Sequence, residues 1–275
     1  MATIKETNNS KLVICSSIQD FVNYINSNPL NSLSVGNEHS QEESIIYRTD
    51  FTGTSNYAEA EDLLLHGWDY MAKELKSKIG ANTGLTGHTQ RQVYSVAGVV
   101  PCVPRYLQGL PDSMVTYKRV PKREKVLTIN KDFMYSSSVG QETIINESVK
   151  VLNAVNKLEK QGYRIKLNIV CTAWSSTNSW TAKKHTVKKH TVKVCIKQSS
   201  QRLNIKQVAF PLVHPSMLRR IWFKCIEHDP FCNLESFAKT KGYCMNSKEQ
   251  CKGEYYIPSR VSENEITDIS KYWVE

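Results

Sequence analysis

The residues best suited to binding chemistry lie in one stretch of the chain that is basic and contains two tryptophans. Fourteen Lys or Arg and no Asp or Glu occur from Lys160 to Ile226. Loop tryptophans can stack on unpaired bases while neighbouring cations neutralise phosphates, as in proteins that hold single strands. The sequence therefore predicts a nucleic-acid-binding face that comprises Arg164, Lys166, Trp174, Trp180, Lys183, Lys184, Lys188, Lys189, Lys193 and Lys197.

Charge alone does not identify what this basic face binds. A concentrated positive field attracts nucleic acid, an anionic surface or an acidic protein. A purely structural interpretation is also open, in which the tryptophans pack on the core and the lysines protect the edge of a sheet from pairing. The N-terminal part has the opposite charge, since residues 1–62 carry three Lys or Arg and nine Asp or Glu.

Residues with catalytic potential are present, but they do not form a recognisable catalytic set. The seven histidines are scattered, and none belongs to a known nucleophile motif with a Ser or Cys. The chain has no Gly-x-Gly-x-x-Gly and no Walker loop for phosphate binding. The sequence therefore predicts no catalytic residue and no cofactor, and it favours a binding function over an enzymatic one.

Cysteines are the remaining candidate ligands, and the chain has eight of them. Several lie near one another in sequence without the paired Cys-x-x-Cys spacing that marks zinc sites. The candidates are Cys225, His228, Cys232, Cys244 and Cys251. Since no secretory signal is present, we expect reduced thiols that behave as small buried apolar side chains, and no metal site.

Length and hydropathy favour a folded protein of the cytosol. With 275 residues, of which 40% are hydrophobic, the chain is long enough to bury a full core. Its longest apolar runs, such as 99–103 and 208–213, are far shorter than a membrane span. The N-terminus has no apolar segment of the kind found in signal peptides, so we expect neither export nor insertion into a membrane.

Hydrophobic periodicity is most regular in the middle of the chain. Residues 126–130 have the pattern of a strand, 144–160 that of an amphipathic helix, and 163–171 that of a second strand. This order predicts a βαβ unit with parallel strands and a right-handed crossover. Residues 188–197 alternate between apolar and polar side chains, which predicts an antiparallel edge strand paired with 163–171.

The acidic N-terminal part has the pattern of short helices. Ser17 and Asn56 each precede an apolar helical repeat, in the position of an N-cap. A segment rich in turn residues, 81–92, is typical of a linker. We therefore expect an acidic helical segment over 1–92 and an α/β core with a basic face over 93–275.

Further helices are expected after the predicted strands. Residues 204–213 and 215–226 have helical spacing, and Pro215 stands in the first turn of the second one. A closing helix is expected after the capping sequence that begins at Ser262. The predicted fold class is α/β, a three-layer Rossmann-like sheet with an antiparallel edge strand.

Several phrases of the sequence resemble a family of uncharacterised proteins from tailed phages and prophages. The similarity runs from about residue 45 to the C-terminus. It rests on Phe51-Thr-Gly-Thr-Ser, Ala58-Glu-Ala-Glu-Asp-Leu-Leu, Val96-Ala-Gly, Val103-Pro-Arg-Tyr-Leu-Gln-Gly, Ala209-Phe-Pro-Leu-Val-His-Pro-Ser-Met-Leu-Arg-Arg and Tyr256-Ile-Pro. The core over 126–197 also resembles a von Willebrand factor A-type domain, which has a metal-binding loop after its first strand.

The second resemblance implies a site for Mg²⁺, but this chain departs from the required pattern. The loop of such domains carries Asp-x-Ser-x-Ser, whose hard oxygens hold the ion. The matching positions here are Met134, Ser136 and Ser138, and Asp132 comes two positions too early. Methionine does not replace a carboxylate ligand, so we expect a degenerate loop without metal.

These observations together predict a phage-encoded, non-enzymatic binding protein of the host cytoplasm or the virion. The preferred partner is nucleic acid or a nucleoprotein complex, and an acidic protein surface is the other ligand that the charge allows. A second interpretation is a virion or assembly protein that forms oligomers or contacts phage structural or host proteins. A third is a host-defence antagonist with a pocket that the sequence does not reveal.

Overall fold

A mixed β-sheet forms the centre of the protein. The computed structural model describes residues 1–27, 52–79, 88–121, 125–136, 138–177, 186–232, 244–245 and 247–275. The strand order is β1-β2-β8-β7-β6-β10, and β9 pairs with β7 outside this path. The strands are β1 (Thr3–Glu6), β2 (Ser10–Cys15), β6 (Val126–Asp132), β7 (Arg164–Thr177), β8 (Thr186–Lys197), β9 (Cys244–Met245) and β10 (Tyr255–Ile257).

The predicted βαβ unit is confirmed. Strands β6 and β7 are parallel neighbours, and α6 (Gln141–Lys160) connects them. Several of its apolar positions, among them Val151 and Val155, are fully buried against the sheet and the neighbouring helices. Strand β8 pairs antiparallel with β7, as expected. The fold class is therefore α/β with a three-layer, Rossmann-like arrangement.

Strand β8 does not lie at the edge of the sheet, because the N-terminal residues cover its other side. Strand β2 pairs with β8 in parallel, and β1 follows as the outer strand. Alternate residues of β2 are buried, including Val13 and Cys15. The expectation of a purely helical N-terminal segment is corrected by these two strands. Residues on both sides of the expected boundary at 92 thus contribute strands to one sheet.

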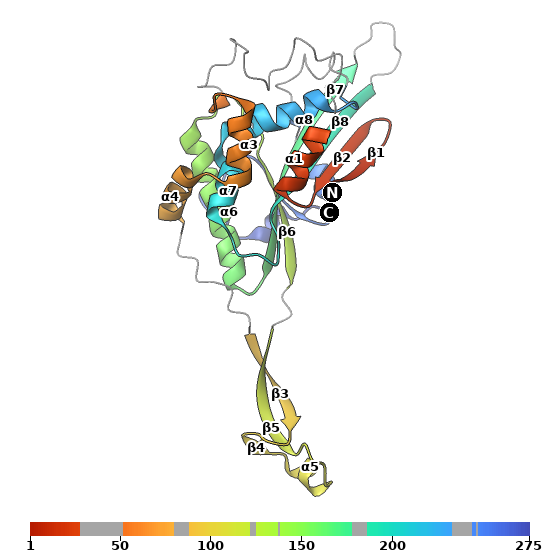
Figure 1. Cartoon of the computed structure of the whole chain (residues 1–275), viewed down its shortest axis with the longest axis vertical. Helices are drawn as coiled ribbons and strands as arrows, with labels where there is room; N and C mark the ends of the chain where they lie inside the picture. The colour runs from red at the N-terminus through yellow and green to blue at the C-terminus, as the bar shows by residue number, and fades with distance from the viewer. Residues whose placement is uncertain are drawn as a thin grey trace.

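Helices cover one face of this sheet (Figure 1). The set comprises α1 (Ile18–Ser27), α3 (Tyr57–His66), α4 (Asp69–Lys78), α6, α7 (Ile205–Val213), η1 (Met217–Trp222) and α8 (Phe223–His228). Both expected N-caps are confirmed: the Ser17 hydroxyl accepts from the amide of Asp20, and the Asn56 side chain accepts from that of Glu59. Helix α7 packs on α3, α4 and α6, so it joins the helical layer to the main core.

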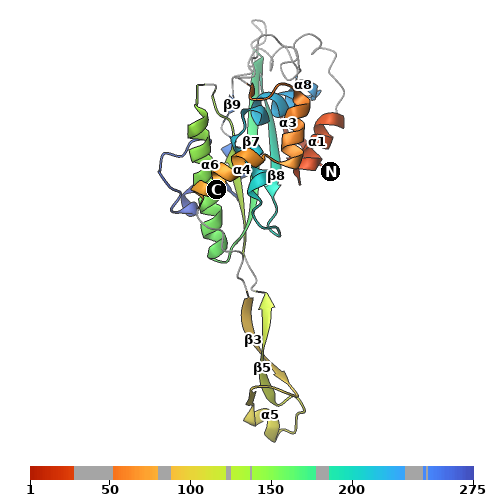
Figure 2. The same cartoon turned by 60° about the vertical axis from the view of Figure 1, so that its left-hand side comes forward.

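Residues 247–275, which we call the C-terminal segment, cover the other face of the sheet. The segment contains η2 (Lys248–Cys251) and η3 (Ile269–Tyr272), and Figure 2 shows it running along the side of α6. A small cluster of Val170, Cys251, Tyr256 and Val274 fills this side. The expected closing helix after Ser262 is wrong, since only the single turn of η3 forms there.

A second, three-stranded sheet projects away from the body (Figures 1 and 2). It contains β3 (His88–Ser95), β4 (Val100–Pro101) and β5 (Met114–Pro121), with the short helix α5 (Val103–Leu107) at its far end. We call residues 88–121 the arm. The sequence patterns predicted a linker over 81–92, and they did not predict the hairpin.

Gly67 ends α3 in a conformation that other residues adopt with strain. Its φ is +86°, and a Cβ atom would lie 2.7 Å from the carbonyl oxygen of Lys206. We expect Gly67→Ala to lower the free energy of unfolding by about 1–2 kcal/mol, measured by urea denaturation. Gly140→Ala is the matched control, because Gly140 precedes α6 with φ −66° and open space around it. Equal effects of the two changes would contradict this explanation.

Candidate interaction surfaces

Two lysines of the predicted basic face are buried and paired with carboxylates. Lys197 is only 2% exposed, and its ammonium group lies 2.6 Å from a carboxylate oxygen of Glu159 on α6. Lys193 is 7% exposed and donates to Glu254 of the C-terminal segment. Both partners lie outside the acid-free stretch of sequence. These two cations therefore stabilise the fold and are not presented to a phosphate, contrary to their placement on the predicted face.

The far end of the β7–β8 ladder keeps the aromatic and basic character that the sequence suggested. Trp174 is directly opposite Lys189, and Ser175 is opposite Lys188. The Lys189 ammonium group is 2.8 Å from a carboxylate oxygen of Glu249. Lys188 lies over the ring of Phe231, 5.2 Å from its centre. Trp174, Lys188 and Lys189 are partly exposed, so these side chains of the predicted face reach the surface at this end of the ladder.

Of the remaining predicted residues, those that the structure describes are not gathered at this end of the ladder. Trp180, Lys183 and Lys184 lie outside the described residues. Arg164 and Lys166 are at the start of β7, and eight residues separate Lys166 from Trp174. An extended strand rises about 3.3 Å per residue, so these two positions are roughly 26 Å apart. The seven described residues of the predicted face thus do not form one compact site.

A layer of polar side chains joins the sheet to the C-terminal segment. Asn168 donates to Asn130, which in turn donates to the carboxylate of Glu254. Glu254 also receives the hydrogen bond from Lys193, so the four side chains form one connected network. Buried polar groups without partners are costly, and this network supplies partners for each of them.

The loop that follows β6, where von Willebrand factor A-type domains carry their metal site, uses its carboxylate for a structural contact. The carboxylate of Asp132 accepts hydrogen bonds from the Met134 amide and from the Tyr256 hydroxyl, at 2.9 and 2.7 Å. Burial raises the pKa of Asp132, although the hydrogen bond from Tyr256 opposes this effect. The hydroxyls of Ser136 and Ser138 bond to each other at 3.1 Å. Asp132 is thus engaged in holding the C-terminal segment.

A buried aspartate connects four elements at the other end of the helical layer. The Asp229 carboxylate accepts from Lys11 of β2 at 2.7 Å, Tyr24 of α1 at 2.6 Å and His190 of β8 at 2.9 Å. Burial alone raises a carboxyl pKa, but the bonds from His190, Lys11 and Tyr24 hold the pKa of Asp229 well below its usual value. This cluster fixes the N-terminal strand and helix onto the sheet.

The cysteines proposed as soft ligands lie in two separate cores. Cys225 and Cys232 are buried in the main core, and burial raises the pKa of both thiols well above the usual value. Cys251 belongs to the small cluster on the other face of the sheet. Within the described part of the chain, no three His, Cys, Asp or Glu side chains are grouped as metal ligands. The Cys244 side chain is not described.

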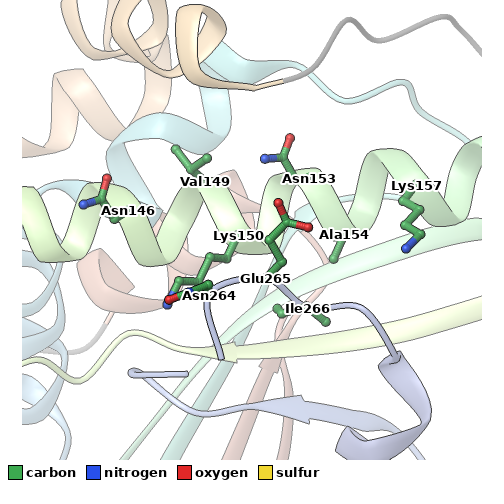
Figure 3. A pocket seen from close by; sticks show the side chains of 9 residues that line it. All are labelled: Asn146, Val149, Lys150, Asn153, Ala154, Lys157, Asn264, Glu265 and Ile266. Carbon is green, nitrogen blue, oxygen red and sulfur yellow. The ribbon is translucent and has the colours of Figure 1, made fainter. Parts of the chain in front are cut away.

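A groove of about 480 Å³ runs between α6 and the C-terminal segment (Figure 3). Its walls are polar and small apolar side chains: Asn146, Val149, Lys150, Asn153, Ala154, Lys157, Asn264, Glu265 and Ile266. Lys150 is already bound to Glu147 and to the Val261 carbonyl. None of the nine lining residues is a Ser, Thr, Tyr, Cys or His, so the lining has no hydroxyl, thiol or imidazole group.

The arm has the largest accumulation of exposed apolar side chains among the described residues. From Arg91 to Lys118 only Val115 is buried. Nine large apolar side chains there are 36–78% exposed: Tyr94, Val96, Val99, Val100, Val103, Tyr106, Leu107, Leu110 and Tyr117. We call this set the arm tip. Apolar patches of this kind in soluble proteins mark surfaces that meet a partner.

The only two charged residues between Tyr94 and Tyr117 neutralise each other. Arg105 donates to the carboxylate of Asp112 at 2.6 Å and lies over the ring of Tyr94. The hydrogen bond from Arg105 lowers the pKa of Asp112, and the same bond raises the pKa of Arg105. The arm tip is therefore apolar without net charge, and its loop is held in a defined shape.

The protein is thus an α/β protein with a Rossmann-like body and a projecting arm that exposes apolar side chains. The chain belongs to the family described as Domain of unknown function (DUF7192), whose model matches residues 3–272. Comparisons with curated proteins and with solved structures gave no match. In the described parts of the chain, no helix has the length and apolar character needed to span a membrane.

The burial of Lys197 leads to a test of its role. We expect Lys197→Met to lower the free energy of unfolding by about 3 kcal/mol, because Glu159 is left as a buried charge without its cation. The double change Lys197→Met/Glu159→Met restores much of the loss, as measured by urea denaturation. Lys166→Met, at a partly exposed position of β7, is the control and has a small effect. A large loss with Lys166→Met and none with Lys197→Met would contradict the assignment.

Proposed function

We propose that this protein is a non-enzymatic assembly protein that binds a protein partner through the arm tip. The observation that carries the proposal is the concentration of nine exposed apolar side chains on a part of the arm, from Tyr94 to Tyr117, that has no net charge. Burying apolar surface is the main driving force of protein association, and aromatic residues are enriched in such interfaces. Tyr94, Tyr106 and Tyr117 provide three of these aromatic side chains.

The arrangement of charges supports a protein partner at the arm tip over nucleic acid. Binding to phosphates requires unpaired cations, and the single arginine of the tip is held by Asp112. The resemblance to phage proteins and to von Willebrand factor A-type domains fits an assembly role, with a place in the host cytoplasm or the virion. Both resemblances are part of the proposal.

Crosslinking at the arm tip tests this function. A photoreactive amino acid at position 107, in the full chain produced in cells that carry its gene, is expected to form an adduct with a protein. Position 107 is suited because the Leu107 side chain is 78% exposed. The matched control is position 70 on α4, where Tyr70 is 74% exposed and stands outside the tip.

The products are identified by mass spectrometry after nuclease treatment. A protein adduct formed at position 107 and absent at position 70 supports the proposal. Equal adducts at both positions, or adducts at 107 that contain only lipid or nucleic acid, contradict it.

A second candidate function is contact with single-stranded nucleic acid at the end of the β7–β8 ladder. The observation that favours it is the pairing of Trp174 with Lys189 and of Ser175 with Lys188. In this register Trp174 and Lys189 lie on the same face of the sheet, so an aromatic ring has a cation beside it, as a stacking platform requires. Lys188 adds a positive charge on the other face of the same strand. The contribution of Trp180, Lys183 and Lys184 belongs to the same proposal.

The second function predicts a tryptophan-dependent and salt-dependent affinity. Trp174→Ala is expected to weaken binding to a single-stranded oligonucleotide about ten-fold or more, as measured by fluorescence anisotropy. Raising the salt concentration lowers the affinity, with a log–log slope of about 0.7 per phosphate neutralised. Trp273→Ala is the control, since Trp273 is an exposed tryptophan on the C-terminal segment. Absent binding at low salt, or equal losses with both changes, speaks against nucleic acid.

A further inference from the structure

The distribution of exposed apolar side chains limits what the arm tip can meet on a copy of the same chain. Fourteen large hydrophobic side chains are exposed among the described residues, and nine of them are on the arm tip. The other five are divided among the N-terminus, α4, β6 and the C-terminal end, at Met1, Ile4, Tyr70, Val126 and Trp273. The described body therefore has no apolar surface that matches the tip. On a second copy, the matching surface is the other arm tip.

From this distribution we infer that two copies of the chain associate end to end through their arm tips. The inference rests on the proposed function and names its partner. A contact of this type is isologous, since the same patch is used on both subunits. It buries the uncharged tips and leaves the two bodies at opposite ends of the dimer.

The charges of the arm favour this end-to-end arrangement. We call the part of the arm nearest the body, residues 88–92 and 117–121, the stem. It is basic, because Arg91 is directly opposite Lys118 and Gln90 is opposite Arg119. Two stems placed side by side bring like charges together, which is destabilising. With the tips in contact and the stems pointing apart, the positive groups are kept at a distance. The uncharged tips can approach without repulsion.

The shape of the tip is fixed before any partner arrives. The amide of Val99 donates to the carbonyl of Val115, and that of Cys102 donates to Ser113, each at 2.7 Å. The amide of Leu110 donates to the carbonyl of Arg105 at 3.1 Å. A preorganised surface loses little conformational entropy on binding, which favours a specific protein contact over loose insertion into lipid.

Sedimentation velocity of the purified full chain over a concentration series tests the inference. We expect a monomer–dimer equilibrium for the natural chain and for Tyr70→Asp. For Leu107→Asp we expect a dissociation constant at least about a hundred-fold higher, because each dimer loses two buried leucines and gains two charges at its interface. Thermal unfolding of Leu107→Asp is expected to be unchanged, since Leu107 is 78% exposed in one copy.

Salt and mixing experiments separate this contact from the alternatives. Higher salt is expected to strengthen the dimer, because it screens the repulsion between basic stems. In a mixture, the tagged natural chain is expected not to recover Leu107→Asp. Recovery of this variant would show instead that the arm docks on the body of the next copy, and it would overturn the tip-to-tip contact.

Two further results would overturn the inferred dimer. The first leaves the proposed function intact, and the second contradicts it as well. In the first result, the chain is monomeric at all concentrations and salt conditions, while position 107 still crosslinks to a different protein in cells. This result contradicts self-association and supports an arm that binds another protein. In the second result, the natural chain forms no dimer and binds anionic lipid vesicles, and Leu107→Asp abolishes this binding. This result contradicts both the dimer and the proposed protein partner.

Discussion

The rest of the structure depends on the pairing of β7 with β8, the ladder with eleven aligned residue pairs at the centre of the sheet. One face of this ladder is apolar and packs on the helices. The other carries Asn168, Thr172, Thr191 and Lys193, whose polar groups require partners when buried. The C-terminal segment supplies them through Ser247 and Glu254. The helical layer thus buries the apolar face of this ladder, and the C-terminal segment supplies hydrogen-bond partners for its polar face.

Local sequence patterns were sufficient for the elements whose signal lies within a few residues. The βαβ unit, the antiparallel strand that follows it and the caps at Ser17 and Asn56 were all predicted correctly. The N-terminal strands were not predicted, because the alternation over Ser10–Cys15 is short and its partner in the sheet is about 180 residues away in sequence. Such a pairing depends on long-range packing, which local propensity does not contain.

The candidate site was harder to predict than the fold, for an electrostatic reason. A count of charges along the chain does not show which cations will meet carboxylates from other segments. Lys193 and Lys197 meet Glu254 and Glu159, both of which lie outside the acid-free stretch. The arm tip did leave a signal, since the sixteen residues from Val96 to Pro111 contain a single charged residue, Arg105. That signal becomes informative only when the hairpin places these side chains away from the core.

Strand pairing within the arm also determines how this element is attached. His88 is aligned with Pro121 in the β3–β5 ladder, so the entry and exit of the arm lie one strand spacing apart, about 5 Å. No strand of the central sheet comes from within residues 88–121. An insertion with adjacent ends can change in length or sequence without altering the path of the chain through the body. Relatives with the same body can therefore differ in the length and the surface of this element.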